Sequence, residues 1–257
     1  MTLDPDDVRA RIAEWIWVPE EARTVDDDEF LLIAYPAYFS DPTVATRWHS
    51  ERPADELIDD VLAAAQGLGR SSVNFFDLSD TTRPPDLERR LRERGAEQTE
   101  TLAVLAGDLT SGIPDLDVPH DVEPRPITDV TDVIALERLD HEVFGGQLRP
   151  EDDVAADFAA KGPDPSRVLA WRGDALVGVA GYTVAGDSLR LWGGAVAENA
   201  RHTGVYRALL DHRLRAGLAE GCRVALVKGR VDTSAPVLLR AGFEEYGEVR
   251  AYRLGRS

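Results

Sequence analysis

The sequence predicts an α+β protein built from two similar halves, and three observations lead to this fold class. Its 257 residues exceed the usual length of one compact domain, which is about 100–200 residues. Hydrophobic residues make up 43% of the chain, which is enough to form a sizeable core. Strand-like and helix-like patterns alternate, and residues 44–105 and 188–254 share the order strand, helix, strand, short helix, strand. We therefore expect an internal structural duplication.

The first half alternates apolar runs, typical of strands, with amphipathic stretches, typical of helices. Strands are expected at residues 30–35, 44–49, 72–78 and 97–105. Helices are expected at residues 6–17, 54–67 and 86–94. The second of these helices carries apolar residues at helical spacing and stops at the Gly-Leu-Gly of residues 67–69, because glycine readily ends a helix.

A linker is expected at residues 113–121, between a domain of residues 1–112 and a domain of residues 122–257. The surrounding stretch combines prolines, a glycine and several aspartates without any periodicity. In the second domain, strands are expected at residues 122–127, 167–172, 176–184, 188–196, 224–228 and from 243 to about 254. Helices are expected at residues 129–140, 205–219 and 234–241, and residues 151–160 form a helix or a loop.

Charge and composition exclude several classes of function. The net charge of −18 opposes binding to nucleic acid or to an anionic membrane surface. Residues 1–120 hold 11 basic and 26 acidic side chains (−15), whereas residues 121–257 hold 18 and 21 (−3), so the second half tolerates an anionic ligand better. No Cys/His cluster has metal-ligand spacing, and the single Cys222 cannot form an internal disulfide. We therefore expect no metal cofactor. No apolar run is long enough to span a bilayer, and the acidic N-terminus is unlike a signal peptide, so we expect a cytoplasmic protein.

The most informative segment is residues 189–214, where a strand runs through a polar loop into a helix. A helix that begins in this way exposes unpaired backbone N–H groups and the positive end of its dipole, which together suit a phosphate group. Gly204 allows the backbone to turn and to approach a ligand closely. An ordinary strand-to-helix connection remains the alternative interpretation of this glycine.

Residues Arg201-His202-Thr203-Gly204-Val205 resemble the R-x-x-G-x-G/A loop of the GCN5-related N-acetyltransferases. Residues 231–243 resemble a second signature of that family, a short helix leading into a Gly-Phe pair, and the element order of residues 122–254 matches as well. The resemblance implies two tandem acetyltransferase-like domains, each a twisted, mixed, mostly antiparallel sheet flanked by helices. It also implies acetyl-CoA as co-substrate.

The resemblance assigns contacts with acetyl-CoA to the loop, to the start of the short helix and to the end of the preceding strand. The freed backbone groups of that strand, at residues 195–197, would bind pantetheine and the thioester carbonyl. The cofactor-binding residues would be Ala195, Val196, Ala197, Arg201, His202, Thr203, Gly204, Val205, Tyr206 and Ser234. Three positions depart from the family pattern: Tyr206 replaces the last small residue of the loop, Glu198 replaces a common proline, and Leu238 replaces a tyrosine that can protonate the leaving thiolate.

Acyl transfer to an amine needs a base, and the sequence leaves its identity open among Glu198, Glu142 and His141. Glu198 is our candidate catalytic residue, and Tyr246 and Tyr252 are the nearest phenols that could replace the missing tyrosine. Glu142, Phe144, Tyr182 and Trp192 are candidates for the acceptor pocket, and packing in the core is the favoured alternative for each aromatic ring.

The first half resembles a degenerate copy of the same fold, because the loop Ser-Glu-Arg-Pro at residues 50–53 lacks both the Arg-x-x-Gly spacing and the turn glycine. We expect no coenzyme A binding there. The whole chain, as a monomer or homodimer, is expected to acetylate an amine of a small molecule or protein. A coenzyme-A-binding or structural module without catalysis is the alternative, since one fold hosts many functions.

Overall fold

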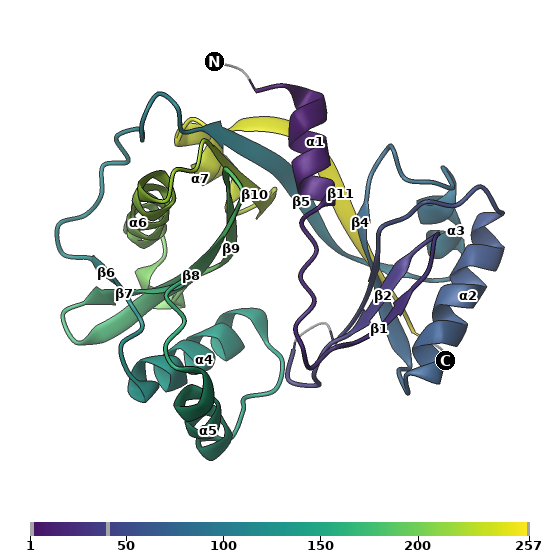
Figure 1. The fold of residues 1–257 in the computed structure, drawn as a ribbon, viewed down its shortest axis with the longest axis horizontal. Helices are drawn as coiled ribbons and strands as arrows, with labels where there is room; N and C mark the ends of the chain where they lie inside the picture. The colour runs from purple at the N-terminus through teal and green to yellow at the C-terminus, as the bar shows by residue number, and fades with distance from the viewer. Residues whose placement is uncertain (1–2, 40–41, 256–257) are drawn as a thin grey trace. The chain divides into compact units, whose positions relative to one another are not determined.

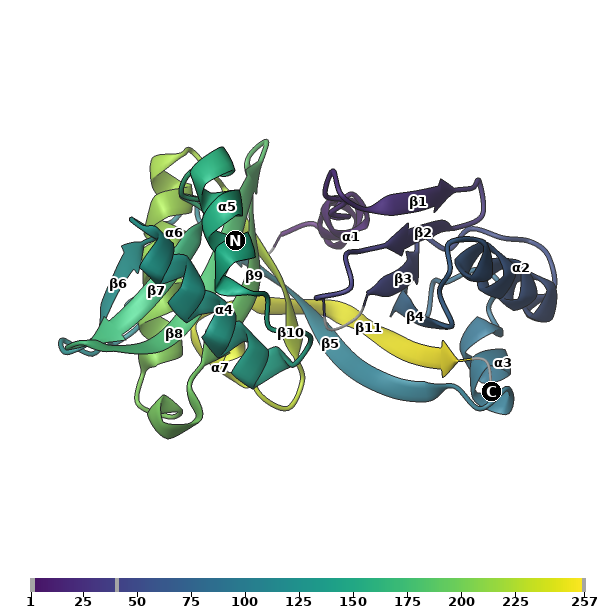
Figure 2. The same cartoon turned by 90° about the horizontal axis from the view of Figure 1, so that it is seen from below.

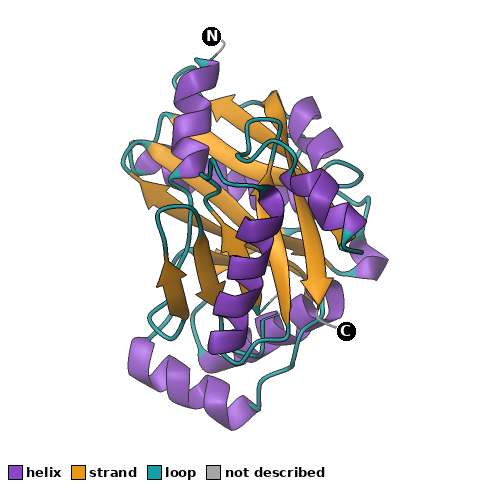
Figure 3. Ribbon diagram, turned by 90° about the vertical axis from the view of Figure 1, so that its right-hand side faces the viewer, coloured by secondary structure: helices purple, strands orange, loops and turns teal. Residues whose placement is uncertain are grey.

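The computed structural model describes residues 3–39 and 42–255. It shows a mixed α/β protein with mostly antiparallel strand pairing and helices beside the strands (Figures 1 and 3). The chain forms two compact units. Unit 1 contains residues 1–12 and 104–246, and unit 2 contains residues 13–103 and 247–257.

Unit 1 contains the region in which the sequence predicts the phosphate loop. Its helices are α1 (Pro5–Ala13), α4 (Val130–Phe144), α5 (Glu151–Lys161), α6 (Val205–Ala219) and α7 (Ala235–Arg240), with a short 3-10 turn η1 (Glu198–Ala200). Its strands are β6 (Glu123–Pro126), β7 (Arg167–Arg172), β8 (Ala175–Ala185), β9 (Ser188–Val196) and β10 (Val224–Arg230), together with the end of β5 (Glu97–Asp108) and the start of β11 (Glu244–Gly255). The strand order is β5-β10-β9-β8-β7-β6.

Helices cover both faces of the unit 1 sheet, because side chains alternate along each strand. Val168 and Ala170 of β7 pack with residues of α6 in one apolar cluster. Leu169, between them, packs with α4 and with Phe158 of α5 in another cluster. Figure 1 shows α6 above these strands and α4 and α5 below them, and in Figure 2, seen from below, α4 and α5 lie in front of the strands. We call these two sides the α4 face and the α6 face.

Unit 2 is built around a smaller sheet in the order β1-β2-β3-β4-β11. Its own elements are β1 (Arg23–Asp26), β2 (Leu31–Ala34), β3 (Thr43–Thr46), α2 (Ala54–Gly67), β4 (Ser72–Leu78) and α3 (Leu87–Glu93). Leu57, Ile58 and Val61 of α2 are fully buried against the strands, which include Tyr252 and Leu254 of β11.

The two units repeat one topology. In each, a strand leads through a helix to a parallel neighbour: β3-α2-β4 in unit 2 and β9-α6-β10 in unit 1. A short helix and a long strand follow each of these motifs. The long strand that follows β4 in sequence, β5, neighbours β10 in unit 1, whereas β11 pairs antiparallel with β4 in unit 2. Each of these long strands is divided between the units: residues 97–103 of β5 and 247–255 of β11 belong to unit 2, and the rest of both strands belongs to unit 1.

Most expected elements are present, and three differ from expectation. The first helix ends at Ala13, not Trp17, and β1 was not expected. Helix α4 continues to Phe144, so Glu142 lies on a helix and not in the loop that we expected after residue 140. Residues 113–121 are irregular, as expected of a linker, but they lie within unit 1 and do not separate the units.

Within residues 3–39 and 42–255, no helix is long and apolar enough to cross a membrane. The same residues contain no group of three or more His, Cys, Asp or Glu side chains that could hold a metal ion.

Candidate acyl-CoA site

Strands β9 and β10 start as parallel neighbours and then separate. Their pairing runs from Ser188–Val224 to Leu191–Val227, while β9 continues to Val196 and β10 to Arg230. On its other side β9 remains paired with β8 up to Val196. The backbone of residues 192–196 therefore presents hydrogen-bonding groups toward the gap that opens beside β10.

Helix α6 begins just beyond the end of β9. Gly204 precedes it in a left-handed conformation, with φ of 87°, and supplies no side-chain cap. The first turn of α6 holds no acidic side chain, so nothing on the helix itself neutralises the positive end of its dipole. The first N–H groups of a helix have no intrahelical partner. The first turn of α6 lies against the end of β9, where Tyr206 contacts the Gly194 position.

The loop residues Arg201, His202 and Thr203 are exposed. His202 adopts a positive φ of 63°, which is uncommon for a residue other than glycine. The Thr203 hydroxyl donates to the carbonyl of Ala200 at 2.7 Å and accepts from Arg172 at 3.1 Å. The loop therefore has a defined backbone conformation and exposed side chains.

Residues 113–121 lie against the beginning of α6. A Cβ atom built on Gly204 would stand 2.5 Å from Cγ of Pro119, so only glycine fits there without a shift. Arg207, in the first turn of α6, donates from Nη1 to Asp117 at 2.9 Å. Nothing in the sequence indicates this neighbour, because composition marks a segment as irregular without saying what it contacts.

The packing of Tyr206 explains why this chain has a large residue where the family loop has a small one. Its ring lies against Gly194 of β9, where a Cβ would come within 3.0 Å of the Tyr206 Cε2 atom. The guanidinium of Arg213 lies 6.0 Å from the centre of the same ring. The side chain therefore points to the α6 face of the sheet, and burial raises the pKa of Tyr206.

Helix α7 brings Ser234 and Leu238 close to β10. A Cβ on Gly229 would lie 3.2 Å from the Ser234 hydroxyl oxygen and 3.1 Å from Leu238 Cδ1. Leu238 is fully buried. At the position of the family's tyrosine, this chain therefore supplies core packing and no proton.

A cavity of about 620 Å³ lies between α4 and the end of β9. It is lined by Ala135, Arg138, Leu139, Glu142, Leu176, Ala197, Glu198 and Asn199. Glu142 and Glu198, two of the expected base candidates, thus line the same cavity. Both carboxylates are exposed, and Arg138 is held by an ion pair with Glu151. His141, the third candidate, is exposed on α4 and is not among the residues lining the cavity.

The aromatic residues expected to line the acceptor pocket do not lie together. Tyr182 packs in the cluster beneath α6. Trp192 lies over Gly181 on the α4 face, under the guanidinium of Arg167. Alternation along the strands separates the two rings, and Phe144 is 40% exposed at the end of α4. The proposed grouping of Tyr182 with Trp192 is therefore wrong.

Asp140 on α4 is a further candidate site residue, a largely buried carboxylate that the sequence pattern did not single out. Its Oδ2 atom is 3.5 Å from Arg167 Nη2, and its buried Oδ1 has no hydrogen-bond partner among the described residues. Burial raises the pKa of Asp140, and it also raises that of Glu137 one turn earlier. In the sequence, these carboxylates are three residues apart and adjoin the apolar Leu136 and Leu139. This pattern could have indicated that they lie on the buried side of the helix.

The two remaining tyrosines already have hydrogen-bond partners. Tyr246 donates to Glu244 at 2.9 Å and accepts from the backbone of Leu3 at 3.2 Å. Tyr252, in unit 2, is buried and donates to Glu88 at 3.2 Å. Their hydroxyl groups thus have structural partners within their own units.

The corresponding helix start in unit 2, that of α2, carries acidic side chains, unlike the start of α6. Helix α2 follows Pro53 and has Asp55 and Glu56 in its first turn, where their charge would repel a phosphate. In the preceding loop, Arg52 and Ser50 are bound to Glu29. The structure thus places carboxylates around this helix start.

Comparisons with known proteins agree with this geometry. Residues 131–243, less than half of the chain, match the acetyltransferase (GNAT) family. No curated protein gives a significant match.

The chain is also similar in structure to solved proteins. A GCN5-related N-acetyltransferase from Kribbella flavida has a TM-score of 0.67 at 14% identity, with 100% of this chain and 97% of that chain covered. Another from Sphaerobacter thermophilus has a TM-score of 0.65 at 14% identity, covering 97% and 85%. A tandem GNAT protein from the clavulanic acid biosynthesis pathway has a TM-score of 0.55 at 16% identity, covering 96% and 88%. At these identities the likeness establishes the fold.

Proposed function

We propose that unit 1 is an N-acyltransferase domain that takes an acetyl group from acetyl-CoA and transfers it to an amine. The single observation that carries the proposal is the opening between β9 and β10 beside the glycine-led start of α6. A free strand edge suits the amide-rich arm of coenzyme A, and uncapped N–H groups suit its pyrophosphate. The match of residues 131–243 to the acetyltransferase family supports the same assignment.

The proposed binding residues follow from the placement of each segment. Backbone groups of Ala195, Val196 and Ala197 would bind the amide-rich arm and the thioester carbonyl. Backbone groups of residues 201–206 would bind the pyrophosphate. Ser234, whose hydroxyl lies beside Gly229 of β10, would contribute from the start of α7. Tyr206 would contribute only its backbone N–H, since its ring packs under Gly194.

The thioester supplies an activated acyl carbon, and the chain must position the amine and manage its protons. In direct transfer, the amine nitrogen bonds to the acyl carbon, the carbon–sulfur bond breaks, and the sulfur leaves as a thiolate that takes a proton. Glu198 and Glu142 line the cavity on the α4 side and would receive the ammonium proton directly or through water. The carboxylates around this cavity favour a cationic acceptor.

The burial of Leu238 favours a second candidate, a domain that binds coenzyme A without catalysis, because no phenol stands on α7 to protonate the thiolate. A positioned acid contributes about 10²–10⁴-fold to a rate, so its loss slows the reaction without abolishing it. Unit 2, with its acidic helix start, would bind no coenzyme A and would serve a structural or acceptor-shaping role.

The test uses the full-length chain. Calorimetry with acetyl-CoA should give one site per chain, and Arg201→Ala with His202→Ala should leave a weakened site, because most contacts come from the backbone. Thiol release is then followed with alkyl amines, amino sugars, amino acids and a peptide. Amine-dependent release supports the transferase, binding without release supports the second candidate, and failure to bind contradicts both. Two sites per chain would show that unit 2 also binds.

A further inference from the structure

At two places on the unit 1 sheet, an arginine stacked on a tryptophan faces an aspartate of α4, and the first of these sets is closed. The guanidinium of Arg125 on β6 lies 4.8 Å from the centre of the Trp171 ring. It donates to both carboxylate oxygens of Asp132, at 3.0 and 3.1 Å. The backbone N–H and the hydroxyl of Thr128 donate to the same carboxylate, each at 2.9 Å. Asp132 is 3% exposed, so this set is a saturated structural contact.

The second set has the same parts in a looser arrangement. The guanidinium of Arg167 on β7 lies 4.9 Å from the centre of the Trp192 ring. Its Nη2 is 3.5 Å from Oδ2 of Asp140, whereas a charge-assisted hydrogen bond measures about 2.7–2.9 Å. The other guanidinium nitrogens donate to none of the described side chains, and Oδ1 of Asp140 is buried without a partner. Both side chains are 25% exposed, so a small molecule can reach this pair.

The second set lies where the sheet opens. Arg167, Gly181 and Trp192 are aligned across β7, β8 and β9, and a Cβ on Gly181 would overlap the Trp192 ring. Trp192 is the first residue of β9 beyond its pairing with β10, which ends at Leu191. Arg167 Nη1 is 3.5 Å from the position that a Cβ on Gly193 would take. The arginine–aspartate pair therefore lies on the α4 face beside the opening proposed to hold the acyl-CoA arm.

Neighbouring side chains do not complete this pair. Glu137, one turn before Asp140 on α4, is bound to Arg149 at 3.2 Å. Burial and the charge of Glu137 raise the pKa of Asp140, and Arg167 only partly offsets this rise. An added cation would stabilise the Asp140 carboxylate, and an added anion would satisfy the Arg167 guanidinium. The pair is thus complementary to a molecule that carries both charges.

We propose that Arg167 and Asp140 bind the acceptor of the acyl transfer and that this acceptor is a free α-amino acid. Arg167 would bind its carboxylate, and Asp140 would bind its ammonium group. The two protein groups are 3.5 Å apart, so the two charges of the ligand must also be adjacent, as they are on one α-carbon. Rotation about the soft χ2 torsion of Asp140 can turn either oxygen toward the ligand. This inference rests on the proposed function and adds to it the class of acceptor.

The test first measures acceptor binding apart from turnover. Full-length protein is saturated with coenzyme A, which carries no acyl group to transfer. Glycine, leucine, phenylalanine and lysine are then titrated, each beside its α-amide, which keeps the amine and lacks the carboxylate. Calorimetry measures the strong ligands, and ligand-observed NMR measures the weak ones. At least one free amino acid should bind about tenfold or more tightly than its amide, as expected for a charge-assisted hydrogen bond.

Variants then assign the two charges of the ligand. Arg167→Met should reduce the preference for the free amino acid to about twofold or less, while amide affinity stays within about twofold, because the amide lacks the group that Arg167 binds. Asp140→Asn should weaken both ligands alike, since both carry the ammonium group. Arg125→Met removes the other stacked guanidinium and is the matched control, which should keep the wild-type preference.

A conservative variant keeps the test decisive. Arg167→Lys retains a charge but lacks the planar fork, so an intermediate preference of about threefold is expected. If Arg167→Met no longer binds coenzyme A, Arg167→Lys decides by the same ratio. An unchanged preference in the Arg167 variants, or an equal loss of amino acid and amide binding, would overturn the assignment of the carboxylate to Arg167.

The last measurement separates this inference from the function on which it rests. Acetyl-CoA replaces coenzyme A, and thiol release is followed with the same ligands. Release with the amides as readily as with the amino acids overturns the acceptor class and leaves the transferase intact. Amino acid binding without release keeps this site and overturns the transferase. Failure to bind either form of coenzyme A overturns the proposed function and this inference together.

Discussion

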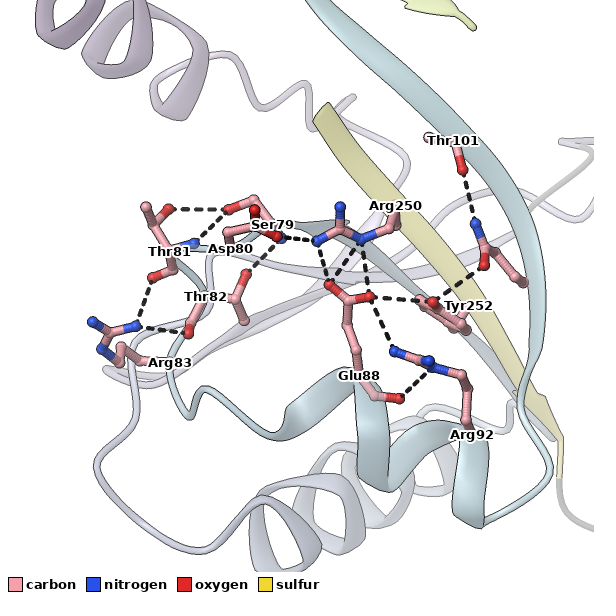
Figure 4. Close-up of polar contacts among 11 residues, drawn as sticks. Ser79, Asp80, Thr81, Thr82, Arg83, Glu88, Arg92, Thr101, Arg250 and Tyr252 are labelled. Atoms are coloured by element: carbon pink, nitrogen blue, oxygen red, sulfur yellow. Dashed lines mark hydrogen bonds and ion pairs between the residues drawn. The ribbon is translucent and has the colours of Figure 1, made fainter. Parts of the chain in front are cut away.

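Arg250 on β11 and Glu88 on α3 form a forked ion pair within unit 2, although 162 positions separate them in the chain (Figure 4). Arg250 Nε lies 3.0 and 2.9 Å from the two carboxylate oxygens, and Nη2 lies 2.8 Å from Oε1. The side chains are 21% and 15% exposed. Tyr252 donates to the same carboxylate, so the pair fixes the last strand of the chain to α3.

Replacing Glu88 with glutamine should destabilise unit 2. The change leaves Arg250 partly buried without its main counter-charge, which costs about 2 kcal/mol of unfolding free energy. Urea unfolding measures the change. Glu93→Gln on the same helix, which affects an exposed pair with Arg89, is the matched control and should have no measurable effect. Equal losses in the two variants would contradict a special role for Glu88.

Replacing Asp140 with asparagine should flatten the pH dependence of stability in unit 1. Burial raises the folded-state pKa of Asp140, so the carboxyl favours folding while protonated. That contribution is complete below the unfolded value of about 3.9 and is lost as pH rises through the folded pKa. The unfolding free energy of wild type should therefore fall, relative to Asp140→Asn, from about pH 4 upward. Parallel curves in urea titrations from acid to neutral pH would contradict this expectation.

Gly204→Ala should destabilise the protein, because alanine disfavours the φ of 87° and its Cβ would overlap Pro119. We expect a loss of about 2 kcal/mol by chemical denaturation. Adding Pro119→Ala removes the overlap and should recover part of this loss, leaving the cost of the left-handed backbone. Equal stabilities of the single variant Gly204→Ala and the double variant would show that Pro119 does not restrict this position.

Asp117→Asn should strengthen acetyl-CoA binding at the proposed site. Asp117 is 92% exposed and pairs with Arg207 in the first turn of α6, so its charge lies close to the proposed phosphate position. An exposed pair is weak, and we expect at most a threefold gain, about 0.6 kcal/mol, at low salt. Calorimetry at two ionic strengths measures it, and the gain should shrink in high salt. A weaker affinity would mean that Asp117 orients Arg207 for the ligand.

Local features of the site could be predicted from the sequence. The bounds of β4, β7, β9 and α6 agree with expectation because each depends on a periodic pattern between turn residues. The turn at Gly204 was also predictable, since a glycine between a polar loop and an amphipathic helix has few other uses. The sequence alone therefore determined where the candidate phosphate loop begins and ends.

Side-chain partners were predicted less well. Aromatic character alone groups Trp192 with Tyr182, but the β8–β9 register places them on opposite faces of the sheet. Asp140 was overlooked beside Glu142, because only the packing of α4 shows which carboxylate is buried. Register and helix orientation are long-range properties, and no local pattern contains them.

The sequence by itself determined the α+β class, the repeated order of elements and the glycine-led loop before α6, because propensity, periodicity and turn chemistry act over a few neighbouring residues. Only the tertiary structure decided that β11 closes unit 2 through Arg250 and that Arg167 meets Asp140 where β9 leaves β10. These arrangements depend on contacts between distant segments, whose energies appear only when the strands have chosen their neighbours.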